Sequence, residues 1–179
     1  MKHVLSIALI ALVFSASAQY RSGGGGGDKV YFGGGFGLSF GTDVTSVSAS
    51  PLVGYKFTDQ LSAGVRLTYQ YVNNKIYDVS FSNYGGGPFT RFQVTDKYFT
   101  HFEYEFLNFE YATGRVINNE LETERDSYNA LWLGAGYRED VGRNAGFFMV
   151  ALYNVLYDEN EPSPYASPLS IRAGFAVGF

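Results

Sequence analysis

Three residues that could do chemistry together, His101, Glu103 and Glu105, occupy alternate positions of one short segment. In a β-strand alternate residues share a face, so the imidazole and the two carboxylates would lie side by side. A histidine beside a carboxylate is the base of many hydrolytic sites, and the same side chains could ligate a metal ion. The segment contains no serine to act as nucleophile, and three such ligands on one strand face are not specific for a metal. The sequence therefore favours a hydrogen-bonded interior histidine and predicts no catalytic residue, metal ligand or cofactor.

Basic residues fall on the same side of other alternating segments as these carboxylates. With each segment taken as an extended strand, the inward-facing bases are Lys56, Arg66, Arg91, Arg138 and Arg172. We expect Arg66 and Arg172 to lie level with Glu103 and Glu105, and the other three bases to lie nearer one rim. Buried charges must be paired and hydrogen-bonded, so a charge network that fills the interior is the favoured interpretation. Because five bases face two acids, a narrow or gated path for anions is the alternative.

Eight segments of alternating polar and apolar residues position these groups. They are 30–40, 44–57, 61–72, 86–94, 98–110, 127–138, 146–157 and 168–179. In the third, every second residue from Leu61 to Tyr71 is apolar and those between are Ser, Gly, Arg, Thr and Gln. A strand with one polar and one apolar face has this pattern. The seventh segment is apolar on both faces, and we place Asn154 inside; Pro51 predicts a bulge or bend in the second.

Short and long connections alternate between the segments. Residues 58–60, 95–97 and 139–144 are short connections, 73–85, 112–126 and 158–167 are longer, and 41–43 is a short exception. The last two of the longer connections are acidic, with Glu120, Glu122, Glu124, Asp126, Asp158, Glu159 and Glu161. Solvated loop charge is the favoured interpretation. Bridging to phosphate groups through divalent cations, or docking of a basic partner, is the alternative.

Composition fits strands better than helices. The chain contains 22 Gly, 15 Tyr and 16 Phe, and strands favour aromatic residues whereas glycine disfavours helices. It contains no cysteine, which excludes a disulfide framework. Its formal net charge of −4 disfavours binding to nucleic acid, which needs a basic surface. After residue 18 no apolar run reaches the roughly 18 residues of a helical membrane span.

The residues before the first alternating segment have a different character. Lys2 and His3, an apolar run and the small residues 15–18 are typical of a secretory signal peptide, with cleavage expected between Ala18 and Gln19. The glycine-rich stretch that follows lacks the Lys-Ser/Thr pair of a phosphate-binding loop, and is expected to be a linker. The predicted organisation is a signal peptide over 1–18, a periplasmic linker over 19–29 and a barrel over 30–179.

Together these features predict an all-β fold, an eight-stranded antiparallel up-and-down transmembrane β-barrel. Segments of about ten residues suit a tilted span of the hydrocarbon layer, and closure of the sheet removes every edge. Outward positions are apolar on nearly every segment, and the alternation runs to Phe179. This pattern favours the barrel over a soluble β-sandwich.

Four stretches of the sequence carry a family resemblance. They are 53–65 (VGYKFTDQLSAGV), 85–89 (GGGPF), 134–138 (GAGYR) and 173–179 (AGFAVGF). They resemble the small outer-membrane β-barrel proteins of OmpA/OmpX type, and the resemblance spans essentially the whole chain after residue 18. It implies a barrel in the Gram-negative outer membrane with both termini in the periplasm. It also implies that Phe175, Val177 and Phe179 form an insertion signal for the barrel-assembly machinery.

The favoured function is that of a structural or interaction protein of the envelope, and membership of a larger outer-membrane complex is one form that this role could take. The expected partners are outer-membrane lipid, lipopolysaccharide and other outer-membrane proteins, and no nucleic acid. Small outward residues, Gly34, Ala49 and Ala63, would permit close packing against such proteins. A narrow pore for small solutes or ions is the alternative. A lipid-modifying enzyme is a more distant one, because the sequence offers no catalytic triad that lipid could reach.

Overall fold

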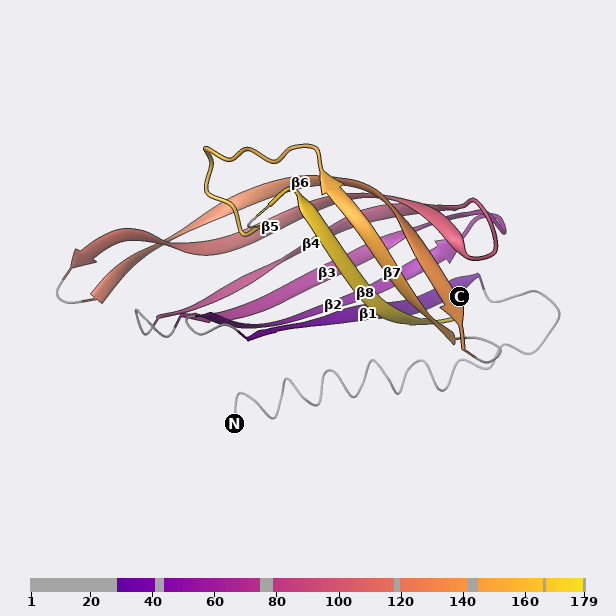
Figure 1. The fold of residues 1–179 in the computed structure, drawn as a ribbon, viewed down its shortest axis with the longest axis horizontal. Coiled ribbons are helices and arrows are strands. Elements are labelled where there is room, and N and C mark those ends of the chain that lie inside the picture. Colours follow the sequence, from indigo (N-terminus) through magenta and orange to yellow (C-terminus); the bar gives the residue numbers. More distant parts are fainter. Residues whose placement is uncertain are drawn as a thin grey trace.

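A computed structural model describes residues 29–40, 44–74, 79–117, 120–141, 145–165 and 167–178 (Figure 1). The predicted signal peptide, nearly all of the predicted linker and Phe179 lie outside these residues. The strands are β1 (Val30–Phe40), β2 (Val44–Lys56), β3 (Leu61–Asn74), β4 (Val79–Gln93), β5 (Tyr98–Ile117), β6 (Glu120–Asp140), β7 (Ala145–Asn154) and β8 (Leu169–Val177). Among the described residues there is no helix long and apolar enough to cross a membrane.

The strands close into one barrel. Each strand pairs with its neighbours in sequence, and β8 pairs with β1. All of these pairs are antiparallel. The predicted all-β, eight-stranded antiparallel barrel is confirmed. Figure 1 shows the β5–β6 hairpin extending beyond the other strands at the end of the barrel opposite the C-terminus.

Side chains alternate between the interior and the outer face along each strand, because the strand repeat is two residues. On β7, Phe148, Val150, Leu152 and Asn154 are buried, whereas the residues between them face outward. Asn154 therefore lies inside, as predicted, which sets the parity of a strand that is apolar on both faces. An interior of eight strands is just wide enough for such side chains to fill it.

Two connections that we predicted as long loops are strands instead. Residues 73–85 belong largely to β3 and β4, which pair as far as Asn74↔Val79. Residues 112–126 belong largely to β5 and β6, which pair as far as Ile117↔Glu120. The seventh segment also ends earlier than expected, at Asn154 rather than at residue 157.

Polar cross-strand contacts explain these longer hairpins. The Tyr71 hydroxyl donates to Ser80 Oγ at 2.9 Å, and Arg125 Nη2 lies 2.7 Å from Glu110 Oε2. Pairs of this kind stabilise a ladder of mostly polar residues, so a polar sequence there does not indicate a loop. The acidic residues that we placed in the connection 112–126 consequently lie on β6, and they are Glu120, Glu122, Glu124 and Asp126.

Of the bulge or bend that we predicted at Pro51, the bulge is absent. The β2–β3 register is the same on both sides of Pro51, from Ala49↔Tyr69 to Leu52↔Arg66. The ladder only loses the pairs at Ser50 and Pro51, because proline has no N–H to donate. In the β5–β6 ladder the register does shift, between Ala112 and Val116.

The seam between β1 and β8 closes the barrel with few pairs. It consists of Phe32↔Val177, Gly33↔Ala176 and Gly34↔Phe175. After Gly34 the described residues of β1 pair only with β2, and before Phe175 those of β8 pair only with β7. Figure 1 shows β1 and β8 diverging toward the end of the barrel opposite the C-terminus.

A layer of buried aromatic rings fills the barrel near the short turns, and we call it the aromatic floor. Its members are Tyr31, Phe89, Phe99 and Phe148. Each ring occupies the space that a Cβ would need at an inward glycine of a neighbouring strand, and the glycines are Gly54, Gly64, Gly136 and Gly174 respectively. The glycines among the inward positions therefore make room for large rings, and the pairs close this end of the interior.

The floor can be tested by adding one methyl group. A Cβ at Gly136 would overlap the Phe99 ring and lie 2.8 Å from the Met149 carbonyl oxygen, which cannot rotate away. We expect Gly136→Ala to lower the free energy of unfolding in urea by about 1–3 kcal/mol. Ala135→Val, which adds bulk to the outer face of the same strand, is the control. Equal losses from both variants would contradict the ring–glycine packing.

Candidate functional site in the barrel interior

Two carboxylates of β5 are the centre of the interior site. Glu103 and Glu105 are 1% and 0% exposed and point into the lumen as successive inward residues. Arg66 of β3 joins them, since its Nε donates to Glu103 Oε2 at 3.0 Å and its Nη2 donates to Glu105 Oε1 at 2.7 Å. Its Nη2 also contacts Glu103 Oε1. A single guanidinium thus holds both acids, which the planar fork of arginine suits better than lysine.

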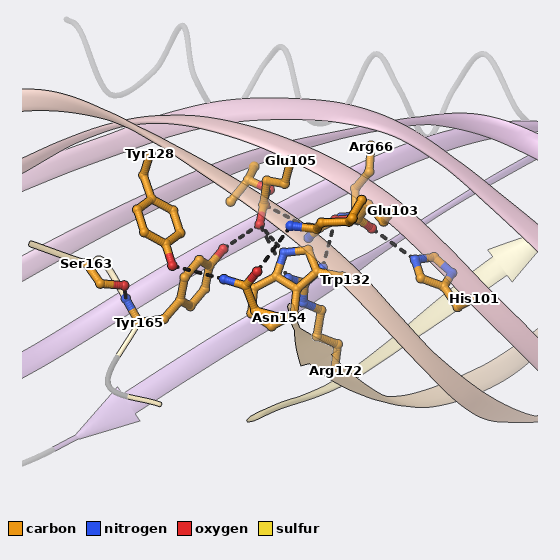
Figure 2. Close-up of polar contacts among 12 residues, drawn as sticks. Arg66, His101, Glu103, Glu105, Tyr128, Trp132, Asn154, Ser163, Tyr165 and Arg172 are labelled. Atoms are coloured by element: carbon orange, nitrogen blue, oxygen red, sulfur yellow. Dashed lines mark hydrogen bonds and ion pairs between the residues drawn. The ribbon is translucent and has the colours of Figure 1, made fainter. Parts of the chain in front are cut away.

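A second arginine reaches the same pair from β8. Arg172 Nη1 donates to Glu103 Oε1 at 3.0 Å, and its Nη2 lies 3.4 Å from Glu105 Oε2. The guanidinium also lies over the Trp132 ring, 4.7 Å from its centroid. The structure therefore brings Arg66, Arg172 and the two glutamates together at one height in the barrel, as we predicted (Figure 2).

Neutral donors complete the surroundings of Glu105. Thr68 Oγ1 donates to its Oε1 at 2.9 Å. Trp132 Nε1 and the Tyr165 hydroxyl donate to its Oε2 at 2.9 Å and 2.6 Å. Tyr165 belongs to the loop between β7 and β8, and Figure 2 shows its ring directed toward this carboxylate. The loop thus supplies a side chain that plugs part of the lumen.

His101 links the glutamates to a third arginine. Arg91 Nε donates to His101 Nδ1 at 3.1 Å, and His101 Nε2 lies 3.0 Å from Glu103 Oε2. Because Nδ1 accepts a hydrogen bond, the proton of the neutral ring lies on Nε2 and is donated to Glu103. The ring also stacks on Phe89 at a centroid distance of 5.6 Å. Both nitrogens are engaged, and no hydroxyl of the described residues is hydrogen-bonded to either.

The predicted network is only partly one cluster. The structure joins Arg66, Arg91, Glu103, Glu105 and Arg172, with His101 between Arg91 and Glu103. The Arg91 guanidinium also lies 4.6 Å from the Phe148 ring centroid, within the aromatic floor. Arg138 lies apart and pairs with Asp140 at 3.0 Å. Of the predicted insertion signal, Phe175 and Val177 face outward on β8, and Phe179 lies outside the described residues.

Sequence reasoning missed the neutral members of the site. Trp132 has the parity of the inward Arg138, and a single large ring beside inward glycines at 134 and 136 is a signal for a central position. Asn154 donates to the Tyr128 hydroxyl at 2.9 Å, a contact that alternation cannot predict because it joins different strands. No sequence pattern indicates that Tyr165 enters the lumen, because loop residues follow no strand periodicity.

The arrangement binds strands together rather than exposing a reactive group. Its hydrogen bonds connect β3, β5, β6, β8 and the β7–β8 loop around two buried carboxylates. No group of three histidine, aspartate or glutamate side chains in the described part of the chain could hold a metal ion. The glutamate oxygens are already occupied by donors of the protein, so the cluster acts as a cross-brace.

Loss of one acid should weaken the brace strongly. We expect Glu105→Gln to reduce the free energy of unfolding by about 3–5 kcal/mol, because it leaves buried guanidinium charge uncompensated. Urea unfolding followed by the fluorescence of Trp132, the only tryptophan, measures this loss. Glu124→Gln, on the exposed part of the β5–β6 hairpin, should change stability by less than about 0.5 kcal/mol. A Glu105→Gln protein as stable as this control would show that the brace is dispensable.

No protein-family model matches the chain, and no curated protein matches its sequence. The features that bear on its function are therefore the closed barrel, its apolar outer face and the charge cluster inside it.

Proposed function

We propose that the protein is an integral β-barrel of the Gram-negative outer membrane that acts as a structural or interaction protein of the envelope. The observation that carries the proposal is the inversion of the usual distribution of side chains. Large apolar residues cover the outside, as with Leu67 at 57%, Phe102 at 46% and Met149 at 55% exposure, while arginine and glutamate are buried inside. A soluble protein rarely exposes a contiguous apolar surface of more than a few hundred Å².

Tyrosines on the outer face support a membrane position. Tyr55, Tyr98 and Tyr137 are exposed near the short turns, and Tyr69, Tyr84, Tyr104 and Tyr153 are exposed toward the other end. Barrels of the outer membrane carry aromatic girdles at both interfaces around an apolar band. The short turns lie at the end where β1 begins and β8 ends, which under this proposal is the periplasmic end with both termini.

The opposite end offers the surface for partners. Beyond Asn108 the β5–β6 hairpin extends past the part of β5 that pairs with β4, and its exposed residues include Arg115, Glu124 and Asp126. Specificity commonly lies on such projections from a rigid scaffold. We propose lipopolysaccharide and other outer-membrane proteins as the partners of this end, and outer-membrane lipid as the partner of the barrel wall.

A narrow pore is the second candidate, favoured by one observation. The interior keeps a cavity of about 260 Å³ beside three arginines. The aromatic floor argues against a continuous path, because four ring–glycine pairs lie across the lumen near the short turns. The cross-braced interior therefore supports the structural role over conduction.

Location in the membrane is tested by a charge on the outer face. Leu133 lies midway along the apolar positions of β6, and we expect Leu133→Arg to cost about 2–4 kcal/mol of insertion free energy. The readout is the amount of folded protein in the outer-membrane fraction of expressing cells. Asn129→Arg, outward on the same strand but beyond its apolar stretch, is the control. Recovery of the wild-type chain in the soluble fraction would overturn the proposal.

Conduction separates the two candidates. With the aromatic floor in place we expect the purified protein to give no ion-sized current steps in planar bilayers. Tyr165→Ala should be equally silent, because it opens the lumen only on the side away from the floor. Current steps from the wild-type protein would establish the pore instead, provided that an unrelated control barrel prepared in the same way gives none.

A further inference from the structure

The interior cavity has a polar side that the charge cluster does not fill. Aromatic rings of Phe109, Tyr128, Trp132 and Tyr165 occupy the part of the lumen next to β5 and β6. The cavity of about 260 Å³ is lined by residues of every strand except β6, and its lining on β2, β3 and β8 includes Ser48, Ser50, Thr68, Ser170 and Arg172. Small hydroxyl side chains therefore leave space directly beside an arginine of the cluster.

The same cavity is lined by residues of the outer face. Phe36 of β1 and Ile171 of β8 contribute to its wall, although both have outward parity. With Leu169 they are the most exposed large apolar side chains of the described chain, at 69%, 77% and 68%. The outward residues in the lining all belong to the two strands of the seam, and Figure 1 shows these strands diverging there. The cavity thus opens sideways, at the part of the β1–β8 seam that has no pairs.

The side chains behind this opening could bind an anion. Arg172 is the most accessible member of the cluster, with its side chain 18% exposed against 9% for Arg66 and 1% for Glu103. The cluster holds three guanidinium groups and two carboxylates: Arg66 and Arg172 contact the carboxylates, and Arg91 reaches them through His101. The hydroxyls of Ser48, Ser50 and Ser170 make no side-chain hydrogen bond to another described residue. A carboxylate or phosphate group could accept from these donors and balance the surplus charge.

The position of the opening adds a requirement for an apolar tail. Unpaired strand edges at the depth of the hydrocarbon layer are tolerated only where they line a cavity or are covered. The seam residues Phe36, Leu169 and Ile171 are apolar, so what lies outside the opening is expected to be acyl chain. We propose that the seam admits an anionic amphiphile of the membrane, with its headgroup bound by Arg172 and its chain outside the wall. This inference rests on the proposed outer-membrane location.

Trp132 provides a reporter inside the site. It is the only tryptophan, is fully buried and lies under the Arg172 guanidinium. A bromine atom quenches tryptophan fluorescence at short range, so 2-bromohexadecanoate bound with its headgroup at Arg172 should quench Trp132 saturably. The mature protein in a neutral detergent is titrated with this acid. 16-Bromohexadecanoate should quench much less, because its bromine stays outside the wall.

Two further probes separate the sources of the signal. The methyl ester of 2-bromohexadecanoate has the same chain without the charge, and equal quenching by it would overturn the inference in favour of apolar partition. 2-Bromobutanoate has the same anionic group without the chain, and saturable quenching by it at the same concentrations would assign the cavity to free anions instead. We expect neither probe to quench Trp132 saturably over the concentrations used for 2-bromohexadecanoate.

Variants of the lining test the role of the charge. Arg172→Gln should raise the half-saturating concentration of 2-bromohexadecanoate by about tenfold or more, because the variant loses a charge-assisted hydrogen bond. Arg138→Gln removes an inward arginine outside the cluster and should leave binding unchanged. Because Arg172→Gln also affects the brace, the pair Ser50→Asp and Ser50→Asn is decisive. The aspartate should weaken binding about tenfold relative to the asparagine of nearly the same size, and equal binding by the two would refute an anion site.

Different experiments test the amphiphile site and the proposed function. Cell fractionation decides the location, whereas quenching in detergent decides whether the seam binds an amphiphile. Loss of quenching together with a cross-linked dimer of the purified protein would assign the open edges to a strand of a second copy. A chain located in the outer membrane whose Trp132 is not quenched by 2-bromohexadecanoate would leave the envelope role standing and remove the site.

Discussion

The need of two buried carboxylates for donors organises the interior of this barrel. Glu103 and Glu105 cannot remain ionised out of water unless most of their lone pairs are satisfied. Two arginines, a threonine, a tryptophan, a tyrosine and a histidine supply the hydrogen bonds. These donors come from β3, β5, β6, β8 and one loop, so the cluster fixes the relative positions of elements that are not all adjacent in the wall.

The rest of the interior is complementary to the cluster. Toward the short turns the aromatic floor uses inward glycines to make room for rings, which gives dense packing around the Arg91 guanidinium. Toward the other end, rings such as Tyr128 and Phe109 pack in the buried cluster, and the serines of β2 line the cavity together with Leu107 and Tyr165. The lumen is therefore uneven across its width, and its emptier side coincides with the seam that has the fewest pairs.

Alternation alone predicted the strand number, the parity and the level of the main charges. It succeeded because the period of two is imposed by the backbone and does not depend on what a side chain meets. It failed wherever the outcome depends on pairing between distant segments. The polar stretches 73–85 and 112–126 became strands through contacts such as Arg125 with Glu110, and composition does not show such contacts.

Two parts of the site were beyond alternation for the same reason. Tyr165 enters the lumen from a loop, where no periodicity constrains direction, and only Glu105 explains its position. The open seam follows from the divergence of β1 and β8, although both sequences alternate as well as those of fully paired strands. A pattern within each strand cannot reveal how many residues two strands from opposite ends of the chain will share.

The position of the charges relative to the seam bears on why they are there. Replacement of a buried ion pair by apolar residues of similar volume is often neutral or stabilising, so stability alone does not account for such a cluster. The aromatic floor demonstrates that this chain can fill its lumen with rings and glycines that hold only one guanidinium of the cluster, that of Arg91. Arg172, the most accessible arginine of the cluster, lies instead on the strand that borders the opening, between outward residues that flank it. A charge placed at the parted wall, and braced from behind by two glutamates, has the arrangement of a binding group held in place rather than that of a filler.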